Sequence, residues 1–223
     1  NDLVAEGREE EALLYAPRER AGQKMGDHRI IFGRDGDGRF FPTVDADGDL
    51  WEEDAPVVMI SWRAAQAYAA WYARRTGLPW RLPWELEWEK AARGVDGRRL
   101  PWGDQYDCVR GNLPLSAPSG VQPAAAHRFP EDRSPYGVLS MAGNVRDWCL
   151  DPWAVRPRAW DGSVFRPPAL TADAPLRCAR GGSIYAAPVD GVASRIGLRP
   201  DTRTGDLGFR LVRPLSPLQE TPC

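Results

Sequence analysis

The sequence has few of the groups that most metal-dependent and nucleotide-dependent enzymes use. Its 223 residues include only two histidines, His28 and His127, and four cysteines that form no C-x-x-C pair. Two histidines exclude a histidine-rich iron or zinc site. No Walker loop, kinase H-R-D motif or Ser/His/Asp set is present either. We therefore assign no catalytic residue from local motifs.

A strong charge and a long apolar run are also missing. The formal net charge is -2, so no electrostatic attraction for nucleic acid or anionic lipid is expected. No apolar run approaches the ~20 residues that a membrane span needs, and no signal sequence opens the chain. We expect neither a nucleic-acid partner nor a membrane partner, and a cytoplasmic location. The even cysteine count permits disulfides, but reduced thiols are the expectation for Cys108, Cys149, Cys178 and Cys223.

Aromatic and turn-forming residues are abundant instead. Ten Trp, 22 Gly and 21 Pro occur, and Gly and Pro interrupt regular elements. Trp supplies a large buried area and an N–H that needs a partner. This composition predicts a loop-rich fold held together by aromatic packing.

Local patterns predict two main helices and several short strands. A short helix is expected over Ala5–Tyr15 with Leu13 and Leu14 on its apolar side, followed by a hairpin from Ile30 to Phe41. The carboxylates of 45–49 form a turn and not an EF-hand loop, because Leu50 stands where that loop needs Gly. Val57–Ile60 is expected to be a buried strand. Ser61 then caps a helix that runs to Arg75 before Gly77, and a second helix runs from Pro83 to Gly94. The side chains expected to face the core are Ala64, Ala67, Tyr68 and Trp71 in the first helix, and Leu86, Trp88 and Ala92 in the second.

Five motifs follow one another between Pro56 and Arg213. They are R-L-P-W-E-L-E-W-E-K-A-A-R-G (81–94), P-W-G-D (101–104), Y-G-V with M-A-G-N-V-R-D-W (136–148), R-G-G-S (180–183) and L-G-F-R (207–210). In this order they resemble the formylglycine-generating enzyme (sulfatase-modifying factor) family. Their phrasing is most similar to the domains of that family that are attached to bacterial Ser/Thr protein kinases.

The resemblance implies an α+β, C-type-lectin-like fold, with two main helices on a small antiparallel sheet and extensive irregular loops. We divide the chain into an N-terminal part with the hairpin (1–55), the family core (56–213) and a tail (214–223). The family's first strand and helix are not found, so the parent protein is expected to extend upstream of Asn1. Arg81, Arg93 and Arg210 are expected to make fixed hydrogen bonds within the loops.

The oxidase members of this family carry two copper-binding cysteines, about three and eight residues after G-G-S. Ala186 and Gly191 stand at these positions here, and neither residue can bind a metal. Copper is therefore not expected. The family also binds calcium near its G-N-x-x-E-W loop. The corresponding groups here are Ser140, the carbonyls of Gly143 and Val145, and Asp147, which predict at most a weak calcium site.

The resemblance then favours a non-catalytic recognition or regulatory module. Its partner would be an unidentified protein or small molecule, and a kinase domain is expected in the same polypeptide. Trp84 stands where the family has a helix-capping Thr, and we expect it to form a binding surface together with the loop after G-G-S. The predicted surface residues are Trp84, Tyr185, Asp190, Arg195, Arg199 and Arg203. Two alternatives remain open: a formylglycine-generating oxidase acting on sulfatase cysteines, and a variable ligand-binding protein of a diversity-generating retroelement.

Overall fold

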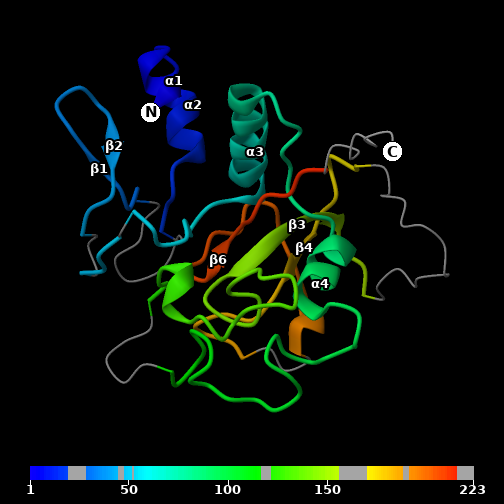
Figure 1. Ribbon diagram of the computed structural model, residues 1–223. Coiled ribbons are helices and arrows are strands. Elements are labelled where there is room, and N and C mark those ends of the chain that lie inside the picture. Colours follow the sequence, from blue (N-terminus) through cyan, green and yellow to red (C-terminus); the bar gives the residue numbers. More distant parts are fainter. Residues whose placement is uncertain are drawn as a thin grey trace, which may run out of the picture.

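The chain folds into a small sheet with two long helices, an N-terminal unit and long loops (Figure 1). The computed structural model describes residues 1–19, 29–44, 48–51, 53–116, 122–155, 170–187 and 191–214. The N-terminal unit consists of α1 (Asp2–Ala5), α2 (Glu9–Tyr15), β1 (Gly33–Arg34) and β2 (Phe40–Phe41). The remaining elements are α3 (Trp62–Thr76), α4 (Glu85–Arg93), η1 (Ala126–Arg128), β3 (Arg146–Pro152), β4 (Arg177–Arg180), η2 (Gly191–Ala193), β5 (Arg195–Leu198) and β6 (Leu207–Gly208).

α3 begins and ends where its capping residues predict. The Ser61 hydroxyl accepts the backbone N–H of Ala64 at 3.1 Å, and Gly77 ends the helix with φ at 69°. The predicted buried face is wrong in part. Ala64 is buried, together with three residues that were not predicted, whereas Tyr68 is 44% exposed. The many alanines make several faces of α3 apolar, so spacing alone does not select one. The buried residues are Trp62, Ala64, Ala65 and Ala69.

α4 is capped by groups from other positions and not by its own N-cap side chain. The backbone N–H of Trp84 donates to Glu87 at 2.9 Å, and that of Glu85 donates to Asp151 of β3 at 2.6 Å. Trp88 and Ala92 face the core as predicted, but Glu85 is buried where Leu86 was expected. Leu86 is only half-buried because the sheet approaches α4 from the side of Glu85.

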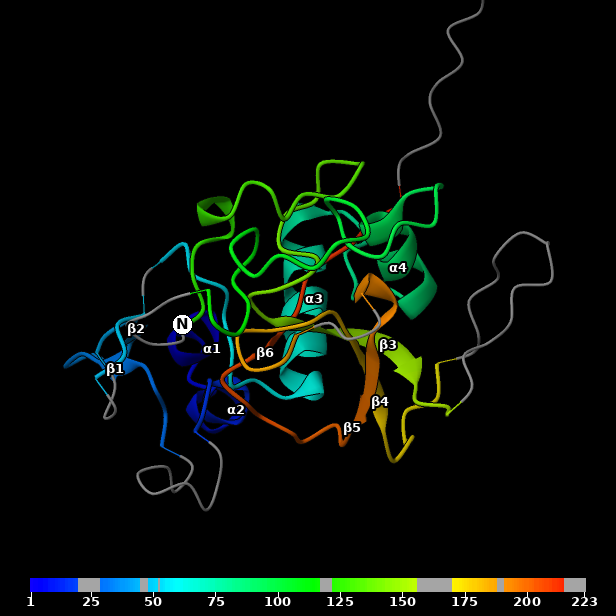
Figure 2. The same ribbon diagram turned by 90° about the horizontal axis from the view of Figure 1, so that it is seen from below.

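The main sheet has the strand order β5-β4-β3-β6. β3, β4 and β5 are antiparallel neighbours, whereas β6 pairs with β3 in parallel, so the sheet is mixed. Figure 2 shows the four strands beside α3 and α4. The predicted strand at Val57–Ile60 is not a regular strand, although Val58 and Ile60 are buried. Met59, with φ at 58°, interrupts the extended backbone there.

The two faces of this sheet contribute to different cores. Trp148 of β3 and Ala179 of β4 pack with α3 residues such as Trp62 and Ala65. Their chain neighbours Cys149 and Cys178 pack with Trp88 and Ala92 of α4. This alternation is the two-residue period of a strand, so α3 and α4 cover opposite faces.

The N-terminal unit is attached to α3 by polar contacts. Asp2 accepts the indole N–H of Trp71 at 2.8 Å and pairs with Arg75 at 3.0 Å. The predicted hairpin is confirmed by the pairing of β1 with β2. The predicted apolar side of the first helix is wrong, because Leu14 is 65% exposed and Ala12 is the buried residue. Most of the predicted turn at 45–49 lies outside the described residues. Among the described helices, none has both the length and the apolar composition that crossing a membrane requires.

Candidate functional site

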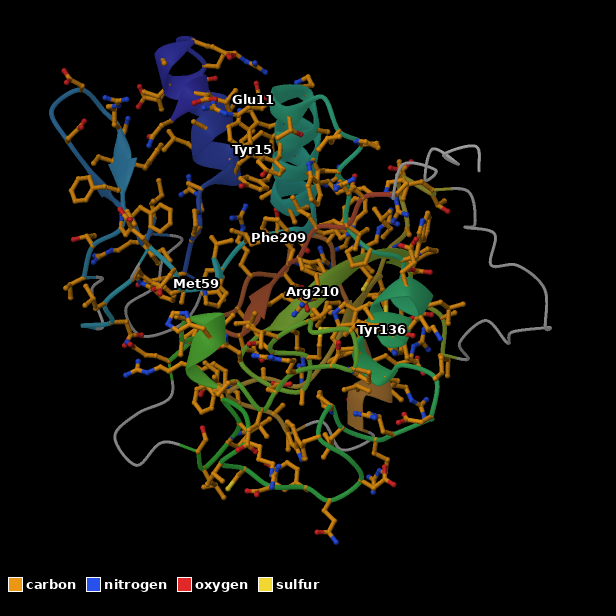
Figure 3. The ribbon with its side chains drawn as sticks, viewed as in Figure 1. Glu11, Tyr15, Met59, Tyr136, Phe209 and Arg210 are labelled. Atoms are coloured by element: carbon orange, nitrogen blue, oxygen red, sulfur yellow. The ribbon has the colours of Figure 1, made fainter. Side chains whose placement is uncertain are left out.

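Asp147 is the centre of a buried hydrogen-bond network. Its Oδ2 accepts the indole N–H of Trp88 at 2.8 Å and the Nε–H of Arg210 at 2.6 Å. Arg210 also donates to the carbonyls of Leu139 and Ser140, at 3.3 and 3.1 Å. Figure 3 shows Arg210 near the middle of the molecule, beside Phe209. The predicted fixed bonds of Arg210 are therefore confirmed, and they join α4, β3 and the loop before β3.

That loop is held by a second buried carboxylate. Asp132 accepts the backbone N–H groups of Met141, Ala142 and Gly143, at 2.9 to 3.0 Å for the shortest bond of each. Burial raises the pKa of Asp132, and these N–H groups oppose the rise only in part. The oxygens of this carboxylate thus accept hydrogen bonds from the backbone. The backbone carbonyl of Asp132 also positions Ser140 by accepting its N–H at 2.7 Å.

The R-G-G-S motif ends in a tight turn at 183–186. Ser183 and Ala186 exchange backbone hydrogen bonds of 2.8 and 3.2 Å. The fully buried Ser183 hydroxyl donates to Asp206 at 2.7 Å and accepts the N–H of Tyr185 at 3.3 Å. Ile184 donates to the carbonyl of Asn144 at 3.0 Å. The turn is therefore attached to the rest of the protein through Ser183 and Ile184, and it presents Tyr185 outward.

Tyr185 is 61% exposed, and both apolar and acidic side chains lie near it. A Cβ placed on Gly205 would lie 3.5 Å from Met59 Cε and 3.6 Å from the Tyr185 hydroxyl, so these two side chains flank Gly205. Partial burial raises the pKa of Tyr185, and the carboxylates of Asp206 and Asp49 add to the rise. Sequence reasoning missed Met59 and Asp206. The position of Asp206 directly before L-G-F-R was the available signal.

The structure separates the residues predicted to share a binding surface. Tyr185 is exposed as predicted, and Arg199 is exposed but pairs with Asp201 at 3.1 Å. Two assignments are wrong. Trp84 is only 6% exposed and belongs to the α3-side core, because its ring fills the space beside Trp148. Arg195 forms a buried ion pair with Glu85 at 2.8 Å and stacks on Trp153 at 4.4 Å.

The two remaining residues of the predicted surface differ from each other. Arg203 is half-buried and donates to the carbonyls of Leu14 and Ala16 at 3.0 and 2.9 Å, which ties its loop to α2. Burial lowers the pKa of Arg203, and Arg18 nearby adds to this. Asp190 lies outside the described residues. Tyr185 is therefore the main side chain of the predicted surface that remains exposed.

The positions of the family's copper ligands hold no thiol. Ala186 closes the turn with Ser183, as described above. Gly191 has φ at 64°, and a Cβ there would collide with the carbonyl oxygen of Arg99. Cys178 of β4 is buried on the sheet face that α4 covers, and its thiol donates to Glu85 at 2.8 Å. Among the described residues there is no group of three or more His, Cys, Asp or Glu side chains that could hold a metal.

The four groups predicted to bind calcium lie on one loop and the start of β3. Calcium prefers six to eight oxygen ligands, with carboxylates among them. Asp147 supplies the one carboxylate of this set, and its Oδ2 is bonded to the cation of Arg210. The four groups do not fit a calcium ion while this pair is intact. Calcium binding at Ser140, Gly143, Val145 and Asp147 stays a prediction that a titration can test.

Comparison with known proteins now identifies the fold and the motifs. The sulfatase-modifying factor enzyme 1-like domain matches residues 43–215. The chain belongs to this family. The inactive C-alpha-formylglycine-generating enzyme 2 of Bos taurus and the formylglycine-generating enzyme of Thermomonospora curvata are each 34% identical to it over 173 residues, which is 70% of this chain. PvdO from Pseudomonas aeruginosa superimposes with a TM-score of 0.64 at 25% identity, over 75% of this chain and 65% of PvdO.

These similarities confirm the α+β, C-type-lectin-like fold and the family resemblance. They also limit what the family name says. The matches cover 49% and 54% of the two curated relatives, so this chain spans about half of their length. The Ser/Thr-protein kinase pkn1 of Chlamydia caviae is 34% identical over 98 residues, which is 43% of this chain and 14% of the kinase. The relatives that this chain matches thus include proteins named as an enzyme, as an inactive enzyme and as a kinase.

Proposed function

We propose that this chain is a non-catalytic recognition domain of the sulfatase-modifying factor family. The observation that carries the proposal is the stretch after R-G-G-S, where Ala186 and Gly191 stand at the positions of the family's copper-binding cysteines. Soft thiolates are the appropriate ligands for copper(I), and Gly191 has no room for a side chain. Without those ligands the family's oxidation chemistry has no centre here.

The recognition surface would be centred on Tyr185. An exposed tyrosine on a rigid turn offers a large amphipathic contact at a low entropic cost. The bonds of Ser183 to Ala186 and Asp206 supply that rigidity. The partner remains a protein or a small molecule. Since a kinase is among the relatives, we further propose that the domain belongs to a longer bacterial protein that contains a Ser/Thr kinase domain.

Copper binding and oxygen consumption with a cysteine-containing sulfatase peptide test the lack of catalysis. The Thermomonospora curvata enzyme serves as the positive control. We expect no stoichiometric copper(I) binding by the chain and no formylglycine in the peptide. Turnover above the background without enzyme would overturn the proposal and favour the oxidase alternative.

The full reading frame tests the kinase association. A kinase H-R-D and D-F-G pair in the same polypeptide would support it, and a frame without any kinase motif would refute it. In a kinase-containing protein, Tyr185→Ala is expected to change the autophosphorylation rate. Tyr136→Ala is the matched control, because Tyr136 is 56% exposed but distant in sequence from the turn. Equal rates for both variants would argue against the Tyr185 surface.

A further inference from the structure

Cys149 and Cys178 lie on the neighbouring antiparallel strands β3 and β4, next to the last pair of their regular ladder. Asp147 pairs with Arg180 and Trp148 with Ala179, and the register shifts after Trp148, so Cys149 and Cys178 are the first residues beyond the regular pairing. Neighbouring strands of a sheet lie about 4.8 Å apart, so residues at this point of the two strands are close in space. Both cysteines have free thiols. The two thiols therefore lie in the same core cluster although 28 residues separate them in the chain.

The packing confirms that the two thiols share one face. Both side chains are fully buried in the core that contains Trp88, Met141 and Val192. Their neighbours Trp148 and Ala179 point into the other core. Neither thiol bonds to the turn at 183–186 or to the side chains of Asp147 and Arg210, although the Cys149 thiol lies 3.8 Å from the carbonyl oxygen of Asp147. The pair is thus a buried dithiol without an assigned role.

The backbone next to this pair is not a regular ladder. The register shifts between Trp148 and Pro152, which marks a bulge in β3. The carbonyl of Cys149 accepts the indole N–H of Trp62 at 2.9 Å, and the N–H of Leu150 donates to Pro83 at 2.9 Å. These groups bond away from β4. A disulfide needs specific Cα separations and dihedral angles, and a bulge gives the strand freedom to reach them.

We propose that Cys149 and Cys178 form a reversible cross-strand disulfide when the protein meets an oxidant such as hydrogen peroxide. Each thiol loses its hydrogen and one S–S bond forms. The O–O bond of the peroxide breaks, and its two oxygens leave as two water molecules. The two electrons pass from the sulfurs to the peroxide, so the dithiol is oxidised and the peroxide is reduced.

Oxidation would change the hydrogen bonds at the start of α4. The Cys178 thiol donates to Glu85 Oε2, and a disulfide has no hydrogen to donate. Glu85 would then keep its bidentate bond to Arg195 of β5 and lose its link to β4. Burial raises the pKa of both thiols, so little thiolate is present at neutral pH and the reaction is slow. β5 is an edge strand of the sheet, and its local opening gives the oxidant a route to Cys178.

The test uses the intact chain under native conditions. The reduced protein is treated with hydrogen peroxide, the remaining thiols are alkylated, and tryptic peptides are analysed without reduction. Trypsin cuts after Arg146 and Arg177, so the two cysteines fall on separate peptides. We expect a Cys149–Cys178 cross-linked pair that dithiothreitol separates. The oxidised protein should unfold about 5 °C higher, because the bond closes a long loop of the unfolded chain.

Cys108→Ser is the matched control, since Cys108 is half-exposed and lies in a loop. The cross-link must form in this variant at the same rate as in the parent chain. It must be absent in Cys149→Ser and in Cys178→Ser. A cross-link that appears only in urea would overturn the proposal. So would products confined to Cys108 or Cys223, or alkylation of both core thiols after prolonged native oxidation.

Discussion

The two faces of the main sheet are stabilised in different ways. The α3 face buries aromatic and aliphatic side chains such as Trp62, Trp148 and Leu207. The α4 face buries charges beside its apolar residues, and the ion pairs Arg195–Glu85 and Arg210–Asp147 cross it at 2.8 and 2.6 Å. The same four strands therefore support a largely apolar core on one side, where the buried cation of Arg177 stacks on Trp62, and a network of ion pairs on the other.

The two faces therefore contribute differently to the stability of the fold and to the exact placement of its parts. Apolar burial is non-directional and tolerates small adjustments, whereas buried ion pairs require fixed partners. The turn that presents Tyr185 continues from β4, whose Arg180 reaches across to Glu89 of α4. We infer that the α4 face sets the position of the turn and that the α3 face supplies most of the folding free energy. Variants on each face can test this comparison.

The largest effect is expected for Trp148→Ala on the α3 face. Trp148 is fully buried, and its indole N–H donates to the carbonyl of Ile60 at 3.2 Å. Removing a buried Trp costs about 3–5 kcal/mol of unfolding free energy through lost burial and a cavity. Urea denaturation measures the change. Tyr106→Ala, at a 51% exposed site, is the control and should lose much less. Equal losses would show that the α3 face is not the main source of stability.

A somewhat smaller effect is expected for Arg210→Met on the α4 face. This change leaves the buried carboxylate of Asp147 without its cation, which costs about 3 kcal/mol. The double variant Asp147→Asn with Arg210→Met should recover part of that loss, because no unpaired charge remains. Arg199→Met removes an exposed ion pair and should cause no measurable loss. A double variant less stable than Arg210→Met would contradict the ion-pair account.

Asp151 makes the α4 face sensitive to pH. Burial raises its pKa to about 6, and the nearby carboxylate of Glu85 adds to the rise. The unfolded carboxyl has a pKa of about 3.9, so the folded protein binds the proton more tightly. This contribution to stability is complete below about pH 4 and is lost as the pH rises through about 6.

Asp151→Asn removes this pH dependence and keeps an oxygen that accepts the N–H of Glu85. Compared with the parent chain, the variant should gain up to about 2 kcal/mol at pH 7.5 and nothing at pH 4. Urea denaturation at both pH values measures the difference. A gain of the same size at both values would show that Asp151 is not the titrating group.

Much of this architecture could be predicted because its signals are local. Ser61 and Gly77 mark the ends of α3 through bonds and dihedral angles that involve only a few neighbours. The five motifs identified the family because their order is a property of the sequence itself. Counting from Ser183 likewise places Ala186 at a position where the family's oxidases carry a copper-binding cysteine.

The errors concern residues whose positions depend on partners that lie far away in the chain. Arg195 was expected on the surface, but its partner Glu85 lies 110 residues away in the chain, and only the fold joins them. Trp84 was expected to be exposed because it cannot cap α4. Asp151 of β3 takes over part of the capping, which leaves the ring of Trp84 free to enter the core. Neither the Arg195–Glu85 ion pair nor the capping of α4 by Asp151 can be recognised from a local sequence pattern.

The smallest effect is expected from calcium. The carboxylate of Asp147 is paired with Arg210 and bonded to Trp88, so a calcium ion would have to displace a cation that is already in place. We expect millimolar calcium to leave the Tm of the parent chain within about 1 °C, since a ligand stabilises only the state that binds it. Magnesium at the same concentration controls for general ionic effects. The comparison becomes sharper with Arg210→Met, in which the carboxylate is released. A calcium-specific rise in Tm for that variant alone would show that Arg210 occupies the family's metal position. A rise in the parent chain would instead mean that calcium and Arg210 share Asp147.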